Sequence, residues 1–135
     1  MLNFVVHRHK TGRSHFDLRL VQDNRLRSWS LLREPPRRKG EHRLAIERES
    51  FSPDALRSTR FEEEAFGEGR VSVWDEGEVE ILAASARRLD LLFKGSHLSG
   101  RYELRRMRWY PGNRWLLKKS GSSQEIPESR GAKVC

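Results

Sequence analysis

Histidines gather around a carboxylate near the N-terminus of this 135-residue chain. Residues 7–20 read HRHKTGRSHFDLRL and contain three of the five histidines, with Asp17 as the only acidic residue among them. Imidazole and carboxylate groups are common ligands of divalent transition metals, and arginine readily binds phosphate. A metal site, a contact with nucleic acid and a polar strand face open to solvent are all compatible with this composition.

The spacing of these residues indicates a β-hairpin. Apolar and polar residues alternate through SHFDLRLV, as in a half-buried strand, and KTGR separates it from the β-branched NFVVHRH. Residues two apart on a strand share a face, so a hairpin would bring His9, His15 and Asp17 together. They could then hold a divalent metal with positions left for water or substrate. Arg19 shares their face and would direct a bidentate donor at a bound phosphate.

Other segments also predict short strands separated by turns. Residues 34–41 are expected to form a loop, because two prolines and a glycine exclude both a paired β-strand and a helix. Residues 52–60 are the one helix candidate, since Ser52 could cap it and Pro53 suits its first turn. RVSVWD and EVEIL are predicted to form a hairpin around the intervening EG. The remaining predicted strands are RLRSWSLL, HRLAIER, LDLLFKG, GRYELRRMRW and NRWLLKK. We therefore expect a mainly β fold, a small closed or partly open barrel of about eight strands with one short helix.

The composition predicts one folded domain, residues 1–119, and a disordered polar tail, residues 120–135. Cys135 is the only cysteine, so an internal disulfide is excluded, as is usual in a reducing compartment. No apolar run approaches the roughly 20 residues of a membrane helix, and MLNFVV is too short for a signal peptide. We expect a soluble, monomeric, cytoplasmic protein, associated with the nucleoid if its source is prokaryotic.

Charge is unevenly spread along the chain, whose formal net charge is +8. Residues 1–43 contain 11 basic and 4 acidic residues, residues 44–82 contain 4 and 11, and residues 83–119 contain 10 and 2. If the two basic segments fold together, they form a positive face suited to a phosphate backbone. The alternative is that the arginines are spread over solvent-exposed strands and form no single positive face, which would give the same composition.

Motifs along residues 3–119 match, in the same order, those of one known family. FVVHRHKTGRSHFDLRL is similar to FVVQKHxASRxHYDFRLE, RSWSLLREPP to KSWAVPKGPS, and HRLAIERE to KRLAVxVEDH. FGEGRVSVWDEGEVEIL, LLFKGSHLSGRYELRRM and RWLLKK are similar to YGAGTVEVWDxGxWxP, FxLxGxxLxGxWxLxRM and WLLIK. The chain thus resembles the 3′-phosphoesterase domain of bacterial DNA ligase D and its stand-alone relatives.

The resemblance implies a small β-barrel enzyme that trims 3′ ends of nucleic acid before sealing, removing a 3′-terminal ribonucleotide and then a 3′-phosphate. Its metal ligands match His9, His15 and Asp17, which implies Mn²⁺ or another divalent ion as cofactor. The implied partners are DNA or DNA–RNA 3′ ends, with an ATP-dependent DNA ligase or a polymerase acting in trans. The residues implied in catalysis or phosphate binding are Arg19, Arg33, Arg43 and Glu49.

The chain departs from the family pattern at several positions. Phe51 and Ala55 stand where the family has His and Tyr, and Phe51 can neither contact a phosphate through an imidazole nor donate a proton to a leaving oxygen. His7 stands where the family often has Gln, and it could be a phosphate contact, an extra ligand or a solvated histidine. The chain starts at Met1, just before the barrel, so we expect it to lack the family's N-terminal extension.

Three functional hypotheses follow. The first is a metal-dependent phosphoesterase in which arginines neutralise charge on phosphoryl oxygens and Glu49 orients a water or an arginine. The second is a catalytically impaired barrel that binds DNA ends or a ligase. The third is an interaction domain that presents the acidic run FEEE. Trp109, near a loop, is the candidate for stacking on bases, whereas Trp29, Trp74 and Trp115 are predicted to pack in the core.

Overall fold

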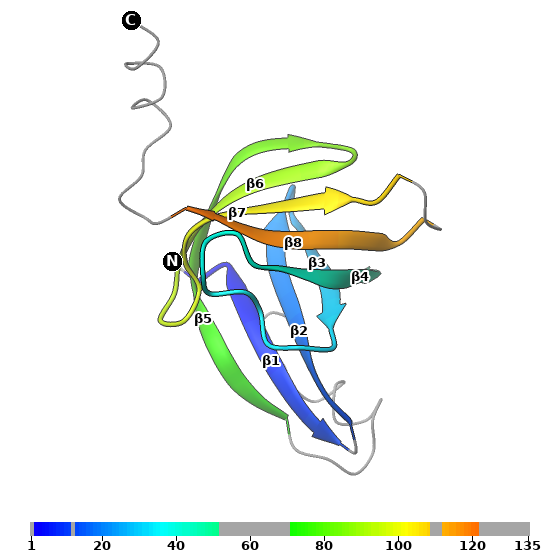
Figure 1. Ribbon diagram of the computed structural model, residues 1–135, viewed down its shortest axis with the longest axis vertical. Helices are drawn as coiled ribbons and strands as arrows, with labels where there is room; N and C mark the ends of the chain where they lie inside the picture. Colours follow the sequence, from blue (N-terminus) through cyan, green and yellow to red (C-terminus); the bar gives the residue numbers. More distant parts are fainter. Residues whose placement is uncertain (1, 12, 52–70, 109–111, 122–135) are drawn as a thin grey trace, which may run out of the picture.

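The computed structural model describes residues 2–11, 13–51, 71–108 and 112–121 (Figure 1). Eight antiparallel strands form a closed barrel in the order β1-β2-β3-β4-β8-β7-β6-β5, and β5 closes it by pairing with β1. These ranges contain no helix, so the mainly β prediction is confirmed and the barrel is closed. The strands are β1 (Phe4–Thr11), β2 (Arg13–Gln22), β3 (Arg25–Leu31), β4 (His42–Phe51), β5 (Val71–Ser85), β6 (Arg88–Lys94), β7 (Ser99–Arg106) and β8 (Arg114–Gly121).

Side chains from alternate strand positions fill the barrel. Phe16 and Leu18 of β2 are buried there, as the alternation of their segment predicts. Trp29 of β3 and Trp115 of β8 are also buried and meet edge to face, with ring centroids 5.8 Å apart. Trp74 is half-buried against the same cluster, so these three tryptophans pack as predicted.

The hairpin predicted around EG is wrong, because β5 runs through this dipeptide without interruption. Gly77 is the last residue of β5 to pair with β1, and Glu78 is the first to pair with β6. A Cβ atom at Gly77 would lie 2.7 Å from the carbonyl oxygen of Lys94. The glycine therefore allows a close backbone approach where one long strand passes between two neighbours to close the barrel.

The QDN stretch forms the turn between β2 and β3, and the predicted loop at residues 34–41 is found. Asp23 and Asn24 have φ angles of 52° and 61°, which is typical of the tight turn that joins two twisted strands such as β2 and β3. The loop between β3 and β4 is held by Tyr102, whose hydroxyl donates to the carbonyl oxygen of Pro36 at 2.6 Å. Burial raises the pKa of Tyr102, so this hydroxyl remains a donor.

Several predicted features lie outside the described residues. They are the helix at residues 52–60, the acidic run FEEE, Ala55, Trp109 and nearly all of the tail. The side chain of Phe51 is likewise not described, although its backbone pairs with Leu26. In the described ranges, no helix is long and apolar enough to cross a membrane.

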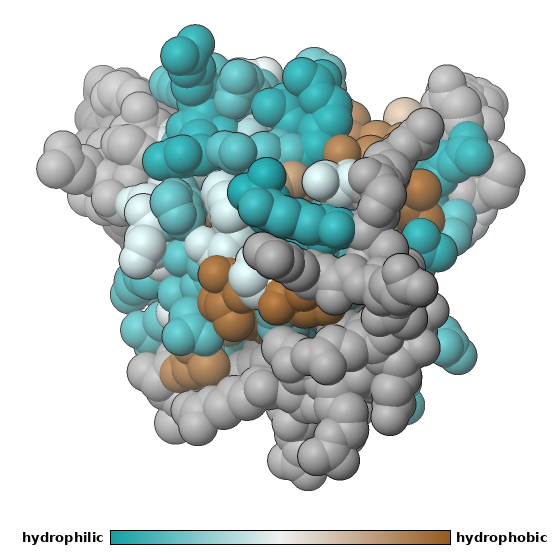
Figure 2. All heavy atoms as spheres, turned by 90° about the horizontal axis from the view of Figure 1, so that it is seen from below, coloured by the Kyte–Doolittle hydropathy of each residue, from teal (hydrophilic) through white to brown (hydrophobic). Residues whose placement is uncertain are grey.

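The two basic segments of the sequence meet in the barrel. β4 begins in the first segment and β8 lies in the second, and His42 pairs directly with Lys118 where the two strands meet. Glu76, Glu78 and Glu80 are exposed on β5, on the other side of the barrel order. In the view of Figure 2, much of the described surface is hydrophilic, with smaller hydrophobic areas between. Elsewhere in the barrel, β4 and β5, whose residues come mainly from the acidic segment, separate the strands of the two basic segments.

Gly95, just after β6, is a sensitive position for stability. A Cβ atom there would lie 2.4 Å from a carboxylate oxygen of Asp75 and 2.6 Å from Phe4. We expect Gly95→Ala to lower the free energy of unfolding by about 1–3 kcal/mol, because buried neighbours must move. Gly112→Ala is the control, since its Cβ would approach only the end of the flexible Arg106 side chain. Urea unfolding of both variants measures the difference, and equal stability of the two would contradict this account.

Candidate metal centre and phosphate site

The polar residues of the β1–β2 hairpin lie on the outer face of the barrel. His9 pairs with His15 and His7 pairs with Asp17, while Phe16 and Leu18 between them point into the core. Despite its outward orientation, this polar row is protected from solvent: His9 is 0% exposed and Asp17 is 3% exposed. The hairpin expected from the sequence therefore places the histidines and the aspartate in a buried outer site.

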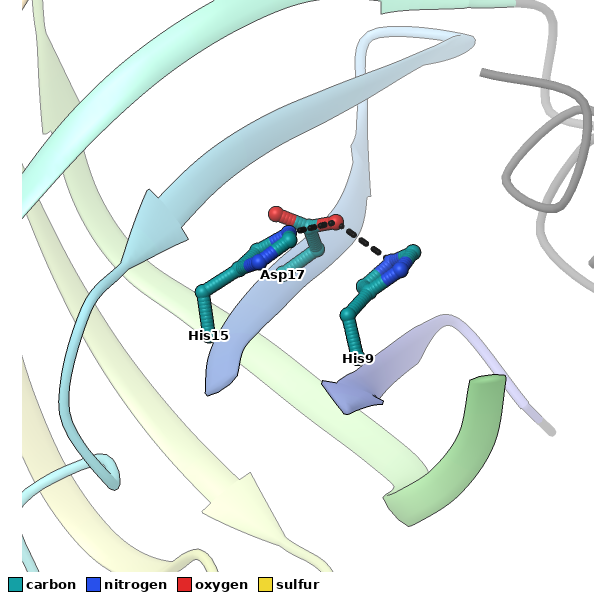
Figure 3. A group of neighbouring side chains, drawn as sticks. All are labelled: His9, His15 and Asp17. Atoms are coloured by element: carbon teal, nitrogen blue, oxygen red, sulfur yellow. Dashed lines mark ion pairs between the residues drawn. The ribbon is translucent and has the colours of Figure 1, made fainter. Parts of the chain in front are cut away.

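Two imidazoles and one carboxylate converge in this site (Figure 3). Oδ2 of Asp17 lies 2.9 Å from Nε2 of His9 and 3.6 Å from Nε2 of His15. The two imidazole rings stack in parallel, with centroids 4.4 Å apart and an interplanar angle of 4°. This stacking directs both Nε2 atoms toward the same carboxylate oxygen.

The geometry of the His9–His15–Asp17 cluster suits a divalent ion. Its three ligand atoms lie within 4.8 Å of one another. Metal bonds to histidine nitrogen and carboxylate oxygen are about 2.0–2.2 Å long, so two ligands of one ion lie up to about 4 Å apart. Small side-chain rotations therefore suffice to place all three atoms around one ion, with further positions left for other ligands.

Asp17 is held in its ionised form. Burial opposes ionisation, but hydrogen bonds from His9 and Ser30 and the nearby charges of Arg19 and His15 outweigh it and lower the pKa of Asp17 to about 2. The carboxylate is consequently charged at neutral pH, as a metal ligand must be.

Arg19 is fixed beside the cluster by two neighbours. Its Nη1 lies 3.0 Å from Nδ1 of His7, and because a guanidinium has no acceptor, the imidazole nitrogen accepts this hydrogen bond. Its Nη2 lies 3.8 Å from Oδ2 of Asp17. His7 and Arg19 are 1% and 5% exposed. His7 therefore orients the guanidinium and is not a solvated histidine.

The other residues singled out by resemblance are Arg33, Arg43 and Glu49. Arg43 donates to the main-chain oxygens of Glu34 and His42, and it shares the inward face of β4 with the buried Ala45. Arg33 is exposed after β3, and Glu49 is exposed at a bulge in the β3–β4 pairing. Within the described ranges, no hydrogen bond or ion pair links Arg33, Arg43 or Glu49 to the His9–His15–Asp17 cluster.

Ser30, which the sequence did not single out, contacts the cluster directly, and Arg48 is joined to the cluster through Ser30. Ser30 donates from Oγ to Oδ1 of Asp17 at 2.6 Å, and Arg48 donates from Nε to the same Oγ at 3.1 Å. The sequence contains a signal for Ser30, because the tight turn at QDN sets a β2–β3 register that pairs it with Asp17. Arg48 has no such signal, since its position depends on a register across a long loop and a bulge.

Fold and site together define a closed eight-stranded barrel with a two-histidine, one-aspartate cluster on its outer face. A model of the DNA ligase D 3′-phosphoesterase domain family matches residues 7–106, and the chain belongs to this family. The multifunctional non-homologous end joining protein LigD of Mycobacterium bovis is 31% identical over 121 residues, 84% of this chain and 15% of that protein. LigD of Pseudomonas aeruginosa is 31% identical over 110 residues, 77% of this chain and 13% of that protein. The chain thus spans less than one sixth of the length of these relatives.

Proposed function

We propose that this protein is a metal-dependent 3′-phosphoesterase that prepares nucleic-acid 3′ ends for joining. The observation that carries the proposal is the buried His9–His15–Asp17 cluster with the guanidinium of Arg19 beside it. Membership of the DNA ligase D 3′-phosphoesterase family and the end-joining relatives support the same reaction and substrate. The proposed substrates are 3′-terminal phosphates and 3′-terminal ribonucleotides on DNA.

Each residue of the site has a distinct task in this proposal. His9, His15 and Asp17 hold the divalent ion, Mn²⁺ in the first instance. When bound there, the ion supplies positive charge that polarises a phosphoryl oxygen and favours ionisation of water. Arg19 binds a phosphate oxygen through its guanidinium, and His7 holds that guanidinium in place. Burial strengthens these charge interactions relative to water.

Roles for Arg33, Arg43 and Glu49 rest on the resemblance. Since the hydrogen bonds of Arg43 go to main-chain oxygens, we assign the principal phosphate contact to Arg19. The family His and Tyr are replaced by Phe51 and Ala55, and loss of one proton-transfer group costs about 10²–10⁴ in rate. We therefore expect turnover below that of relatives that keep both groups, with a ligase or polymerase acting on the product in trans.

A primer–template assay tests the proposed reaction. The purified protein is mixed with Mn²⁺ and a labelled primer that ends in a 3′-phosphate or in a single 3′-ribonucleotide, and the products are separated on a gel. We expect the 3′-phosphate to be removed from the first primer and the terminal ribonucleotide from the second, so that both end in a deoxyribonucleotide 3′-hydroxyl, and no conversion when Mn²⁺ is replaced by a chelator. The His9→Ala variant serves as the inactive control.

The opposite outcome supports a different function. If the native protein binds the primer–template but releases no product with any divalent ion, the chain is a DNA-end-binding module. Its binding should then weaken steeply with salt, because contacts with phosphates displace counterions. Replacement of the family His and Tyr would be the reason for the lost turnover.

A further inference from the structure

A hydrogen-bonded chain connects the cluster to a strand that contributes no ligand. Oδ1 of Asp17 on β2 accepts from Ser30 on β3, and Ser30 accepts from Arg48 on β4. Ser30 pairs directly with Asp17, while Arg48 pairs with Ser28, one position further along the same face. The chain therefore runs across three neighbouring strands of the barrel.

The direction of each hydrogen bond in this chain is determined. An ionised carboxylate only accepts, so the single proton of the Ser30 hydroxyl goes to Asp17. A guanidinium only donates, so the hydroxyl oxygen of Ser30 accepts the hydrogen bond from Arg48. Ser30 is 9% exposed, and its position couples the orientation of Asp17 to that of Arg48.

Arg48 keeps most of its donors available. It is exposed, and in the described part of the chain its only hydrogen bond is the one from Nε to Ser30, with no ion pair. Arg27 differs, because its guanidinium donates hydrogen bonds to the side chains of Glu47 and Gln22. Anchoring through Nε leaves both terminal amino groups of Arg48 as a fork, the arrangement that suits phosphate oxygens.

The two oxygens of Asp17 thus lead to two guanidinium groups. Oδ2 lies near Arg19, and Oδ1 leads through Ser30 to Arg48. A negatively charged group beside the cluster would meet positive charge from both directions. An exposed arginine whose fork only contacts water is the ordinary alternative, but such an arginine needs no buried hydroxyl to position it.

We propose that Arg48 is a second phosphate-binding residue of this site, that its ligand is the terminal phosphate of a nucleic-acid 3′ end, and that Ser30 is a positioning residue for both Arg48 and Asp17. This inference rests on the proposed function. In this proposal, β4 contributes no metal ligand, but its residue Arg48 recognises the 3′-phosphate.

Binding measured without turnover tests the proposal. Affinities for two oligonucleotides, identical except for a 3′-phosphate or a 3′-hydroxyl, are compared by fluorescence anisotropy in the absence of metal. Arg48→Ala should weaken binding of the 3′-phosphate oligonucleotide by about tenfold or more, because a charge-assisted contact is lost. It should weaken 3′-hydroxyl binding no more than Arg87→Ala does, a control that removes one exposed charge in the β5–β6 turn.

Two further variants separate the roles. Arg48→Lys keeps the charge but loses the planar fork, so it should bind the 3′-phosphate with intermediate affinity. Ser30→Ala should lower Mn²⁺ affinity by about 10- to 100-fold, as loss of an outer-shell partner does, whereas Arg48→Ala should leave Mn²⁺ affinity within about twofold. Calorimetric titration with Mn²⁺ provides this second readout.

The outcomes distinguish this inference from the proposed function. If the native protein binds both oligonucleotides equally, the role of Arg48 fails, while the proposed function is decided separately by the primer–template assay with Mn²⁺. If the native protein prefers the 3′-phosphate and Arg48→Ala keeps the same preference, only the role of Arg48 fails. Loss of the preference in Arg48→Ala, with Arg87→Ala unchanged, establishes it.

Discussion

The Asp17→Asn substitution is expected to lower Mn²⁺ affinity by more than 100-fold and to abolish detectable 3′-phosphate removal. Asp17 supplies the only carboxylate of the His9–His15–Asp17 cluster, and even outer-shell partners of a metal cost about 10- to 100-fold when lost. An amide keeps the shape of the side chain but removes the negative charge that offsets the ion and Arg19. Calorimetric titration with Mn²⁺ and the primer assay measure the two effects.

Glu80→Gln provides the matched control for this prediction. It removes one exposed carboxylate from β5 and should leave both Mn²⁺ affinity and turnover unchanged. An Asp17→Asn protein that still bound Mn²⁺ as tightly as the native protein would remove Asp17 from the ligand set. Circular dichroism establishes that the variant keeps its strands.

The Asp75→Ala substitution is expected to produce the largest loss of stability. The buried carboxylate of Asp75 accepts four main-chain N–H groups, from Glu76, Ser96, His97 and Leu98, at 2.7–3.0 Å. Each buried donor left without an acceptor costs about 1–3 kcal/mol, so a loss of at least about 3 kcal/mol is expected. For a chain of this size, that lowers Tm by roughly 10 °C.

Thermal unfolding of Asp75→Ala beside Glu76→Ala tests this prediction. Glu76 is the exposed neighbour on the same strand, and its replacement should change stability by no more than about 0.5 kcal/mol. A similar Tm for the two variants would show that water replaces the carboxylate at the β6–β7 turn. In the expected outcome, His97, whose ring stacks on Trp74, loses its position because its main-chain N–H has lost the Asp75 acceptor.

Much of the site could be predicted from the sequence because its contacts are local. A short hairpin pairs residues in a register set by its turn, so the alternation in SHFDLRLV was enough to place His9 beside His15 and Asp17 on the same face. The tight turn at Asp23 and Asn24 sets the next register in the same way and pairs Ser30 with Asp17. The fold class follows from the same alternation repeated along the chain.

Non-local pairings could not be predicted in this way. The EG dipeptide has the composition of a turn, but tertiary contacts keep β5 extended because it must reach from β1 to β6. The hydrogen bonds of Arg43 to the main-chain oxygens of Glu34 and His42 likewise depend on the path of the loop between β3 and β4. A sequence motif specifies the residue type, whereas strand register and loop contacts decide which group that residue meets.

The sequence by itself determined a β-hairpin with two imidazoles and a carboxylate on one face, since period-two alternation and turn chemistry act over a few residues. Only the tertiary structure decided that this outer face is buried, that His7 holds Arg19, and that Arg48 reaches Asp17 through Ser30. The physical reason is distance along the chain. Arg48 lies 18 residues from Ser30, and the pairing of β4 with β3 across an intervening loop and a bulge brings the two side chains together.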